Sequence, residues 1–392
     1  MAQKVCTTKS SGVIAPHVMA AFERSLKGFG FEVMPITMYD NRDLLRDEFM
    51  KAIQWEPNFA FSYAHQGIVW SNETDPVFRR MGVPLVMLHY DCPFLTSHPK
   101  ILKEYADHPD AYFHFIWDRT YLDEYKRLGI KNVFPIMLAT DPKVFSAQQT
   151  KPEYDLAFVG SIASTDALRA KRETKHPVAI NEVIDRVIAE KIAHPSMPVL
   201  EIVARENTAG LAELVPDWHN EDWVAIFLAL HAEGTAAQRV AYINGTIGPA
   251  PHVFSGIAKG TSDGSRAVHE GPVDYQSGLA SAYRKAKVNL NISAFQLEHS
   301  LNNRIFDAAA AGAFLLTDHR EDLAKVWSGF DAITYHSIEQ LNERVAYYLS
   351  HEKERREIAE ELQRAVLQSH TYDHRTQYIY NTMVDTFEAS PG

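Results

Sequence analysis

Residues Lys287–Asp318, KVNLNISAFQLEHSLNNRIFDAAAAGAFLLTD, contain the pattern that decides the fold. A β-rich run ends near Ser293, a polar loop follows, and apolar residues at helical spacing begin near Asn302. Gly312 is placed to end this helix, and the next apolar run, AFLLTD, starts directly after it. Strand, helix and strand in this order are typical of a βαβ unit in a parallel sheet.

The same alternation extends through most of the chain. Six short β-rich runs precede residue 140, separated by helix-like segments such as PHVMAAFERSLKGFG; the runs are KVCTT, FEVMPITM, NFAFSYA, VPLVMLHYD, AYFHFIWD and NVFPIMLA. We therefore predict an α/β fold with two Rossmann-like, doubly wound domains that face each other across a cleft. The first covers 1–150 and the second 151–370, with a helical elaboration at about 178–247, where only VLEIVA also reads as a strand. A helix over 371–392 is expected to pack back toward the first domain.

The composition is typical of globular proteins, and the net charge limits the kinds of partner that the chain can bind. Of 392 residues, 46% are hydrophobic and 23% charged, and the net charge of −11 argues against nucleic acid as a partner. The two cysteines lie far apart without metal-ligand spacing, so we expect no bound metal. The start, MAQKVCTTKSSG, lacks the apolar core of a secretory signal, and no apolar run is long enough for a transmembrane segment. We expect a cytoplasmic protein.

The helix that begins near Asn302 has a polar face suited to a nucleotide. That face carries Asn303, Arg304 and Asp307. A phosphate at the helix start would meet unpaired backbone N–H groups, and Arg304 would add a positive charge with a planar donor fork. Asp307, one turn further along, is placed to accept hydrogen bonds from ribose hydroxyls. A solvated polar helix face has the same spacing, so the pattern alone leaves both interpretations open.

In the first domain, polar residues follow two of the predicted strands. Gly12, in the turn TTKSSG, would let the backbone approach a phosphate or sugar. His17 opens the next helix, where a neutral imidazole could take a proton from an acceptor hydroxyl. Asp91, in LHYDCP, could act as a general base or bind a sugar hydroxyl. A helix-start histidine and a turn aspartate without such roles are the alternatives.

The second domain offers a turn and a cation after its first strand. Gly160 and Ser161 follow YDLAFV, and Arg169 on the next helix could neutralise a departing phosphate. Solvated helix charges are the alternative for Arg169. The loop-rich stretch 252–275 could cover a nucleotide base, although its glycines also suit ordinary turns. No GxxxxGK[ST], GxGxxG or HExxH is present, so a kinase, a dinucleotide dehydrogenase and a zincin lack their local motifs.

Several of these segments together resemble a known family. NRIFDAAAAGAFLLTDHREDL, ITYHSIEQLNERVAYYLSHEKERREIA and HTYDHR resemble the C-terminal half of CgeB-like proteins, a group of GT-B glycosyltransferases. YDLAFVGS, LHYDCP and LATDPKVF extend the resemblance upstream. It is strong across 302–375 and weak across 178–247.

The resemblance implies a hexosyltransferase-type enzyme that needs no metal or other cofactor. It would move a sugar from a nucleotide-diphosphate donor, a UDP- or GDP-sugar, to a hydroxyl of a glycan, lipid-linked glycan or protein. The D-x-D carboxylate pair usual in GT-A enzymes does not occur. The second domain would bind the donor, with Ser300 also among the donor-binding residues, and the first domain would face the acceptor.

The resemblance leaves the stereochemistry of transfer open. Related retaining enzymes bracket the donor with two acids eight residues apart. Asp307 matches the second acid, and Glu298, nine residues earlier, is the candidate for the first. This arrangement favours retention, whereas His17 or Asp91 as the base would mean inversion. An epimerase or hydrolase of similar fold, and a two-domain binding protein without catalysis, are the alternative functions.

Overall fold

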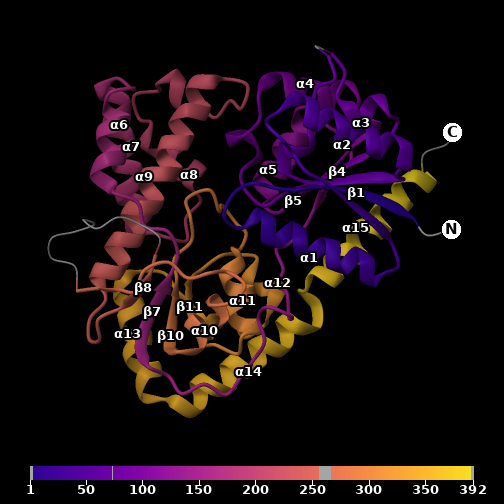
Figure 1. Ribbon diagram of the computed structural model, residues 1–392. Helices are drawn as coiled ribbons and strands as arrows, with labels where there is room; N and C mark the ends of the chain where they lie inside the picture. Colours follow the sequence, from indigo (N-terminus) through magenta and orange to yellow (C-terminus); the bar gives the residue numbers. More distant parts are fainter. Residues whose placement is uncertain (1–2, 73, 256–265, 390–392) are drawn as a thin grey trace. The chain divides into compact units, whose positions relative to one another are not determined.

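The computed structural model describes residues 3–72, 74–255 and 266–389, and the chain divides into two compact units (Figure 1). The first unit combines 1–138 with 371–392, and the second covers 139–370. The sequence analysis placed the division at residue 150. Residues 139–150 pack with the second unit because Thr140 donates a hydrogen bond to Asp307, and Phe145 lies edge-on to Tyr275.

The first unit contains a six-stranded parallel sheet in the order β2-β1-β3-β4-β5-β6. Its strands are β1 (Lys4–Thr8), β2 (Glu32–Ile36), β3 (Phe59–Tyr63), β4 (Leu85–His89), β5 (Tyr112–Ile116) and β6 (Val133–Pro135). Each of the six β-rich runs predicted before residue 140 contains one of these strands. β3, β4 and β5 are buried along their whole length, as expected for a parallel sheet covered on both faces.

Helices and short turns connect these strands. The helices are α1 (Ala15–Gly28), α2 (Arg42–Trp55), α3 (Val77–Arg80), α4 (Pro99–Asp107), α5 (Arg119–Arg127) and α15 (Tyr372–Ala389), with 3-10 turns η1 (Ala64–Gly67), η2 (Pro93–Leu95) and η3 (Pro109–Ala111). The last helix, α15, lies beside α1 in this unit (Figure 1). Tyr372 packs edge-on against Phe22, and Arg375 donates hydrogen bonds to the carbonyls of Met137 and Leu138.

The second unit contains another six-stranded parallel sheet, in the order β12-β11-β10-β7-β8-β9. Its strands are β7 (Tyr154–Val159), β8 (His252–Phe254), β9 (Val268–His269), β10 (Ala286–Asn291), β11 (Leu315–Asp318) and β12 (Thr334–Tyr335). Counted from β7, this is the Rossmann order 3-2-1-4-5-6. The predicted fold class, with two Rossmann-like units, is confirmed.

A long helical crossover joins β7 to β8, as predicted for 178–247. It consists of α6 (Thr165–Glu173), α7 (Val178–Ala193), α8 (Val199–Glu206), turn η4 (Ala212–Leu214) and α9 (Glu221–Gly245). VLEIVA is helical, because Val199, Ile202 and Val203 bury one face of α8. The remaining elements are α10 (Leu279–Arg284), α11 (Asn303–Ala310), α12 (Leu323–Val326), η5 (Phe330–Ile333), α13 (Ile338–Ser350) and α14 (Glu352–Ser369).

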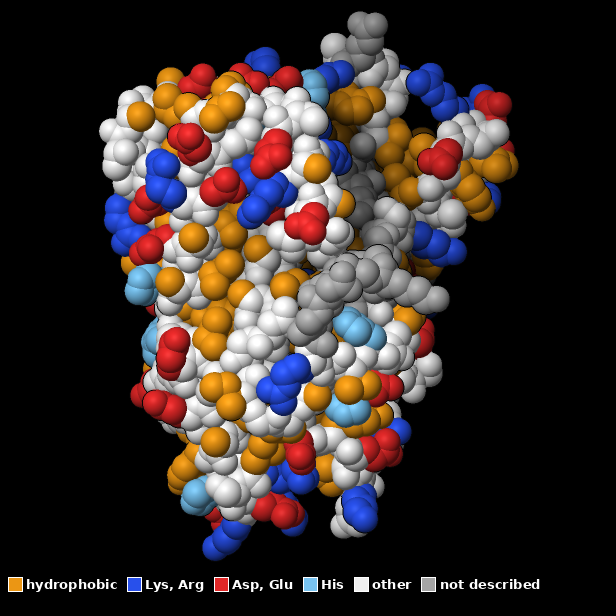
Figure 2. Space-filling view, turned by 90° about the vertical axis from the view of Figure 1, so that its left-hand side faces the viewer, with side chains coloured by type: hydrophobic (Ala, Val, Ile, Leu, Met, Phe, Trp, Pro, Cys, Tyr) orange, Lys and Arg blue, Asp and Glu red, His pale blue; other side chains and the backbone are white. Residues whose placement is uncertain are grey.

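The described surface carries charges of both signs. On the face drawn in Figure 2, Lys and Arg side chains are interspersed with Asp and Glu side chains. Among the helices of the described residues, none combines the length and apolar character needed to cross a membrane.

Candidate functional site

The strand order of the second sheet reverses between β7 and β10. In open parallel sheets, ligands bind outside the carboxyl ends of the strands at such a switch point. β7 is followed by Gly160 and Ser161, and β10 is followed by Ile292 and Ser293. The predicted glycine turn and the helix that follows β10 therefore both belong to this edge of the sheet.

The helix predicted after β10 is α11, which lies between β10 and β11 and ends at Ala310. Gly312, two residues later, has a left-handed conformation (φ +75°). The N-cap residue of α11, Asn302, makes no side-chain hydrogen bond to the helix. Instead, Asn302 Nδ2 donates to Oδ1 of Asn291, 2.9 Å away, at the end of β10. The N-cap side chain thus leaves the first N–H groups of α11 to other acceptors.

Arg304 extends from the first turn of α11 across the end of β7. Its Nη1 donates to Oδ1 of Asn291, and its guanidinium carbon lies 5.3 Å from the centroid of the Phe158 ring. The side chain is half-buried rather than fully solvated, and burial lowers its pKa. Asn291 is itself fixed, because its Nδ2 donates to Thr317 Oγ1.

Gly160 is required by this arrangement. A Cβ atom at position 160 would lie 2.8 Å from Nη2 of Arg304 and 2.9 Å from the Phe158 ring. Glycine therefore lets the Arg304 side chain lie directly against the backbone turn after β7.

Arg239, on α9, is a second cation at the same ring that the sequence analysis missed. Its guanidinium carbon lies 5.8 Å from the Phe158 centroid, and Nη1 donates to the Ser161 carbonyl at 2.6 Å. Burial and repulsion from Arg304 lower the pKa of Arg239 to about 9. Its Nε is buried and has no hydrogen-bond acceptor among the described residues. Two guanidinium groups at one ring form a site whose charge suits an anion.

Close packing of α9 against the loop after β10 fixes the position of Arg239. A Cβ atom on Gly234 would lie 2.1 Å from the Phe295 ring, and Thr235 Oγ1 accepts a hydrogen bond from the Phe295 N–H at 3.0 Å. In the sequence, Arg239 is a single arginine in TAAQRVAYI, a run of mostly small and apolar residues. The helical periodicity of this run indicates a packed helix and gives no sign of a binding residue.

Asp307 does not lie on an open helix face, where the sequence predicts that it accepts hydrogen bonds from ribose. It is only 1% exposed, and it accepts hydrogen bonds from Thr140 Oγ1 at 2.8 Å and Tyr275 Oη at 3.0 Å. Burial raises its pKa to about 8. Asp307 thus accepts hydrogen bonds from two hydroxyl groups, as predicted for the hydroxyls of a ribose. Both hydroxyls belong to the protein, to Thr140 and Tyr275.

Glu298 lies inside the second unit. It is 2% exposed, and its Oε2 accepts a hydrogen bond from the Leu200 N–H, in the first turn of α8, at 3.4 Å. Lys191 is buried in the same neighbourhood, and burial, with repulsion from Arg320, lowers its pKa to about 7. The neighbouring Ser300, also proposed for donor binding, is buried too.

Two more predicted donor residues occupy different surroundings. Arg169 pairs with Glu233 of α9, with Nε 3.2 Å from Oε1, and thus belongs to the packing of α6 on α9. Asn303 is half-buried as the first residue of α11, next to Arg304.

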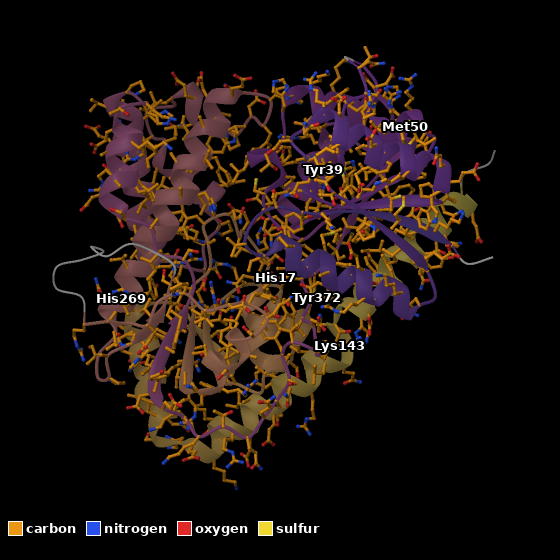
Figure 3. All side chains as sticks on the ribbon, in the orientation of Figure 1. His17, Tyr39, Met50, Lys143, His269 and Tyr372 are labelled. Carbon is orange, nitrogen blue, oxygen red and sulfur yellow. The ribbon has the colours of Figure 1, made fainter. Side chains whose placement is uncertain are left out.

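The predicted residues of the first unit lie at the carboxyl edge of its sheet. Gly12 is exposed after β1 with φ +110°, and His17 is half-buried in the first turn of α1 (Figure 3). Asp91 is exposed after β4, and its Oδ2 accepts a hydrogen bond from Tyr63 Oη at 2.8 Å. This sheet also reverses its strand order, between β1 and β3, so its carboxyl edge is a second place for a ligand.

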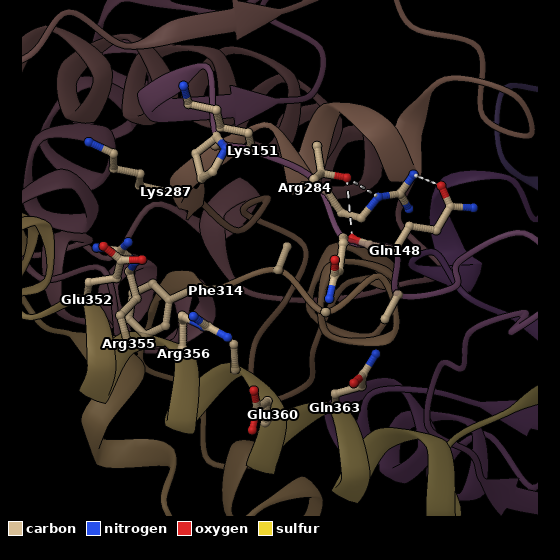
Figure 4. Close-up of a pocket in the computed structure, with 18 residues that line it drawn as sticks. Gln148, Lys151, Arg284, Lys287, Phe314, Glu352, Arg355, Arg356, Glu360 and Gln363 are labelled. Atoms are coloured by element: carbon tan, nitrogen blue, oxygen red, sulfur yellow. Dashed lines mark hydrogen bonds between the residues drawn. The ribbon is translucent and has the colours of Figure 1, made fainter.

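A groove of about 840 Å³ opens at the opposite edge of the second sheet (Figure 4). It is lined by residues at the start of β10 and by α14. Arg284 in this groove is engaged by Gln148, Thr150 and the Ser146 carbonyl. We do not assign the ligand site to this groove, because it lies at the amino ends of the strands.

Comparison with known proteins identifies the kind of fold that carries this site. A family model described as glycosyl transferase-like matches residues 237–381, a segment that includes Arg239, Arg304 and Asp307. The spore protein CgeB of Bacillus subtilis is 31% identical over 108 residues. The match covers 26% of this chain and spans a third of the curated relative (33%).

Solved structures share the architecture along nearly the whole chain. T4 phage BGT in complex with UDP and Mn²⁺ is 10% identical, with a TM-score of 0.53 over 98% of this chain and 99% of that chain. A glycosyltransferase from Rickettsia africae is 9% identical, with a TM-score of 0.54 over 99% and 100% of the two chains. The chain has the GT-B fold of these glycosyltransferase structures, and its residues 237–381 match the glycosyl transferase-like family. Arg239 and Arg304 lie in the segment that matches the glycosyl transferase-like family.

Proposed function

We propose that this protein transfers a glycosyl group from a nucleotide-diphosphate sugar to an acceptor hydroxyl. The observation that carries the proposal is the pair of guanidinium groups, Arg239 and Arg304, at the Phe158 ring. They lie at the switch point of the second sheet, beside the start of α11. The glycosyl transferase-like match over the same residues supports this assignment, as do the complexes of T4 phage BGT with UDP and UDP-glucose.

The donor diphosphate would lie between these two cations. Arg304 offers a planar donor fork, and α11 adds its N-terminal N–H groups and the positive end of its dipole. Both cations would stabilise the negative charge that grows on the leaving diphosphate as the sugar bond breaks. We propose a UDP- or GDP-sugar as the donor. Because the guanidinium groups supply positive charge, we also propose that turnover needs no metal, which activity in EDTA compared with Mn²⁺ would test.

We propose Asp91 as the general base that activates the acceptor hydroxyl, which implies inversion at the sugar. Asp91 is an exposed carboxylate at a strand end, whereas Glu298 is buried against the first turn of α8. His17 is the second candidate base. If Asp91 acts, Asp91→Asn abolishes transfer while donor binding persists, and His17→Gln leaves transfer measurable.

For the acceptor we propose a glycan, a lipid-linked glycan or a protein. The net charge of −11 does not favour a polyanionic acceptor, so nucleic acid is not proposed. The cytoplasmic location expected from the sequence stays a prediction.

Incubation with a panel of nucleotide sugars, with and without acceptors, tests the function. Acceptor-dependent release of nucleoside diphosphate supports transfer. Conversion of the donor without any acceptor indicates a hydrolase or an epimerase instead. Tight binding of the donor without any turnover indicates a binding protein.

A further inference from the structure

The carboxyl edge of the first sheet contains a strained corner that faces Asp91. Tyr63 ends β3, and Ala64, the first residue of η1, has φ +46°. An alanine in this left-handed region is unfavourable and persists only where surrounding contacts hold it. Such strain at a strand end often accompanies a functional side chain.

Two hydrogen bonds join this corner to the segment after β4, one on each side of Ala64. Tyr63 Oη donates to Asp91 Oδ2 at 2.8 Å, and His65 Nε2 lies 2.9 Å from the carbonyl oxygen of Pro93. Because that carbonyl can only accept, Nε2 carries the imidazole proton. The other nitrogen, Nδ1, then accepts from Tyr105 Oη at 2.7 Å.

The hydrogen-bond donor, Tyr63, is rigid, and the carboxylate that accepts from it, Asp91, is accessible. Tyr63 is 8% exposed, with its ring edge-on to Tyr90 at 6.4 Å between centroids. Asp91 is exposed. A buried tyrosine that is already immobile loses little entropy when it holds a carboxylate, and its O–H stabilises the ionised form.

We infer that Tyr63 is a positioning residue that keeps Asp91 ionised and oriented to act as the general base; this inference rests on the proposed function. In the step concerned, Asp91 takes the proton of the acceptor hydroxyl as that oxygen bonds to the anomeric carbon. The bond from this carbon to the donor phosphate oxygen breaks, and its electron pair leaves with the nucleoside diphosphate. Asp91 becomes a neutral carboxylic acid, and Tyr63 keeps its own proton.

The test compares Tyr63→Phe with a matched control, Tyr90→Phe. Each variant removes one tyrosine hydroxyl, and Tyr90 precedes Asp91 in the sequence, but the Tyr90 hydroxyl has no hydrogen-bond partner in the described part of the chain. The pKa of Asp91 is measured by carbon-13 NMR of its carboxyl group without substrates, with Asp91→Asn providing the assignment. The acid limb of kcat/KM against pH is measured in parallel.

For Tyr63→Phe we expect the pKa of Asp91 and the acid limb to rise together by about one pH unit. The KM for the donor should be unchanged, and the Tyr90→Phe control should match the unaltered protein. An unchanged Asp91 pKa in a folded Tyr63→Phe variant would overturn the inference. So would an acid limb that stays fixed while the Asp91 pKa moves.

Two further results keep the inference separable from the proposed function. If Tyr63→Phe does not fold, Tyr63→Leu removes the same hydroxyl, and an Asp91 pKa and acid limb that match the unaltered protein contradict the inference. If the unaltered protein transfers no sugar to any acceptor, the proposed function fails. The NMR comparison still shows whether Tyr63 holds Asp91 ionised.

Discussion

A Cβ atom at Gly160 would occupy space within 2.8 Å of Nη2 of Arg304. Gly160→Ala should therefore displace the Arg304 side chain and weaken binding of UDP or GDP by about tenfold, equivalent to the loss of one charge-assisted hydrogen bond. Calorimetric titration measures the change. Gly28→Ala is the control, because a Cβ atom at Gly28 meets no neighbour within 4 Å. Equal affinities in the two variants would show that the Gly160 contact does not position Arg304 for the ligand.

Asp307 should make the protein less stable as the pH rises. Its folded-state pKa is raised from 3.8 to about 8, so between these values the folded protein holds a proton that the unfolded chain has released. Stability linked to Asp307 is thus fully present below about pH 4 and is lost as the pH rises through 8. Asp307→Asn should be more stable than the unaltered protein by about 2 kcal/mol at pH 8, with a smaller difference at pH 5. Urea unfolding at both pH values measures this; a difference that grows toward acid pH contradicts it.

His65, in the first unit, should make the protein less stable as the pH falls, the opposite of the effect of Asp307. Burial lowers its pKa from 6.5 to about 4, so between these values the unfolded chain binds a proton that the folded protein excludes. The stability contributed by the neutral imidazole is present above pH 6.5 and is lost as the pH falls through 4. His65→Gln keeps a side-chain donor but cannot titrate in this range, and it should cost about 1 kcal/mol at pH 7.5.

The cost of His65→Gln should shrink as the pH falls from 6.5 toward 4. Thermal unfolding followed by circular dichroism at several pH values measures it. A cost that stays constant over this range would show that His65 does not titrate on unfolding.

Glu298 should affect stability more than chemistry. It is buried and its Oε2 accepts the Leu200 N–H, so Glu298→Ala should lower the free energy of unfolding by about 1–3 kcal/mol, because the Leu200 N–H loses this acceptor. Transfer activity at saturating donor should fall less than tenfold. A loss of a thousandfold or more in kcat with unchanged stability would instead assign Glu298 a direct role in the reaction, of the size expected for a lost catalytic group.

The sequence predicts the elements of this fold better than their environments. The strand positions in the first unit follow from local periodicity, and the end of α11 before Gly312 follows from glycine as a helix terminator. Both signals come from residues that are neighbours in the sequence. VLEIVA was ambiguous because short apolar runs fit either a strand or a buried helix. In the structure this segment is the helix α8, because Val199, Ile202 and Val203 bury one face of it.

The candidate site was harder to predict because its contacts join distant segments. Arg304 and Gly160 were selected from local motifs, but their contact depends on the pairing of β7 with β10. Arg239 was missed because its neighbours on α9 are small or apolar, and only the fold brings it to Phe158. The sequence predicts Asp307 on a face open to ribose, because helical spacing does not reveal that Thr140 and Tyr275 donate hydrogen bonds to it.

The most direct measurement of the central claim is calorimetric titration of UDP and GDP into four proteins: the unaltered chain, Arg239→Ala, Arg304→Ala and Arg356→Ala. Arg356 lines the groove of Figure 4 and makes no ion pair or hydrogen bond within the described residues, so it is the matched arginine control. We predict that one of the nucleotides binds the unaltered protein and Arg356→Ala alike, and that each of the other two variants binds it at least tenfold more weakly. Unchanged affinity in Arg239→Ala and Arg304→Ala, or a loss confined to Arg356→Ala, would contradict a diphosphate site at Phe158.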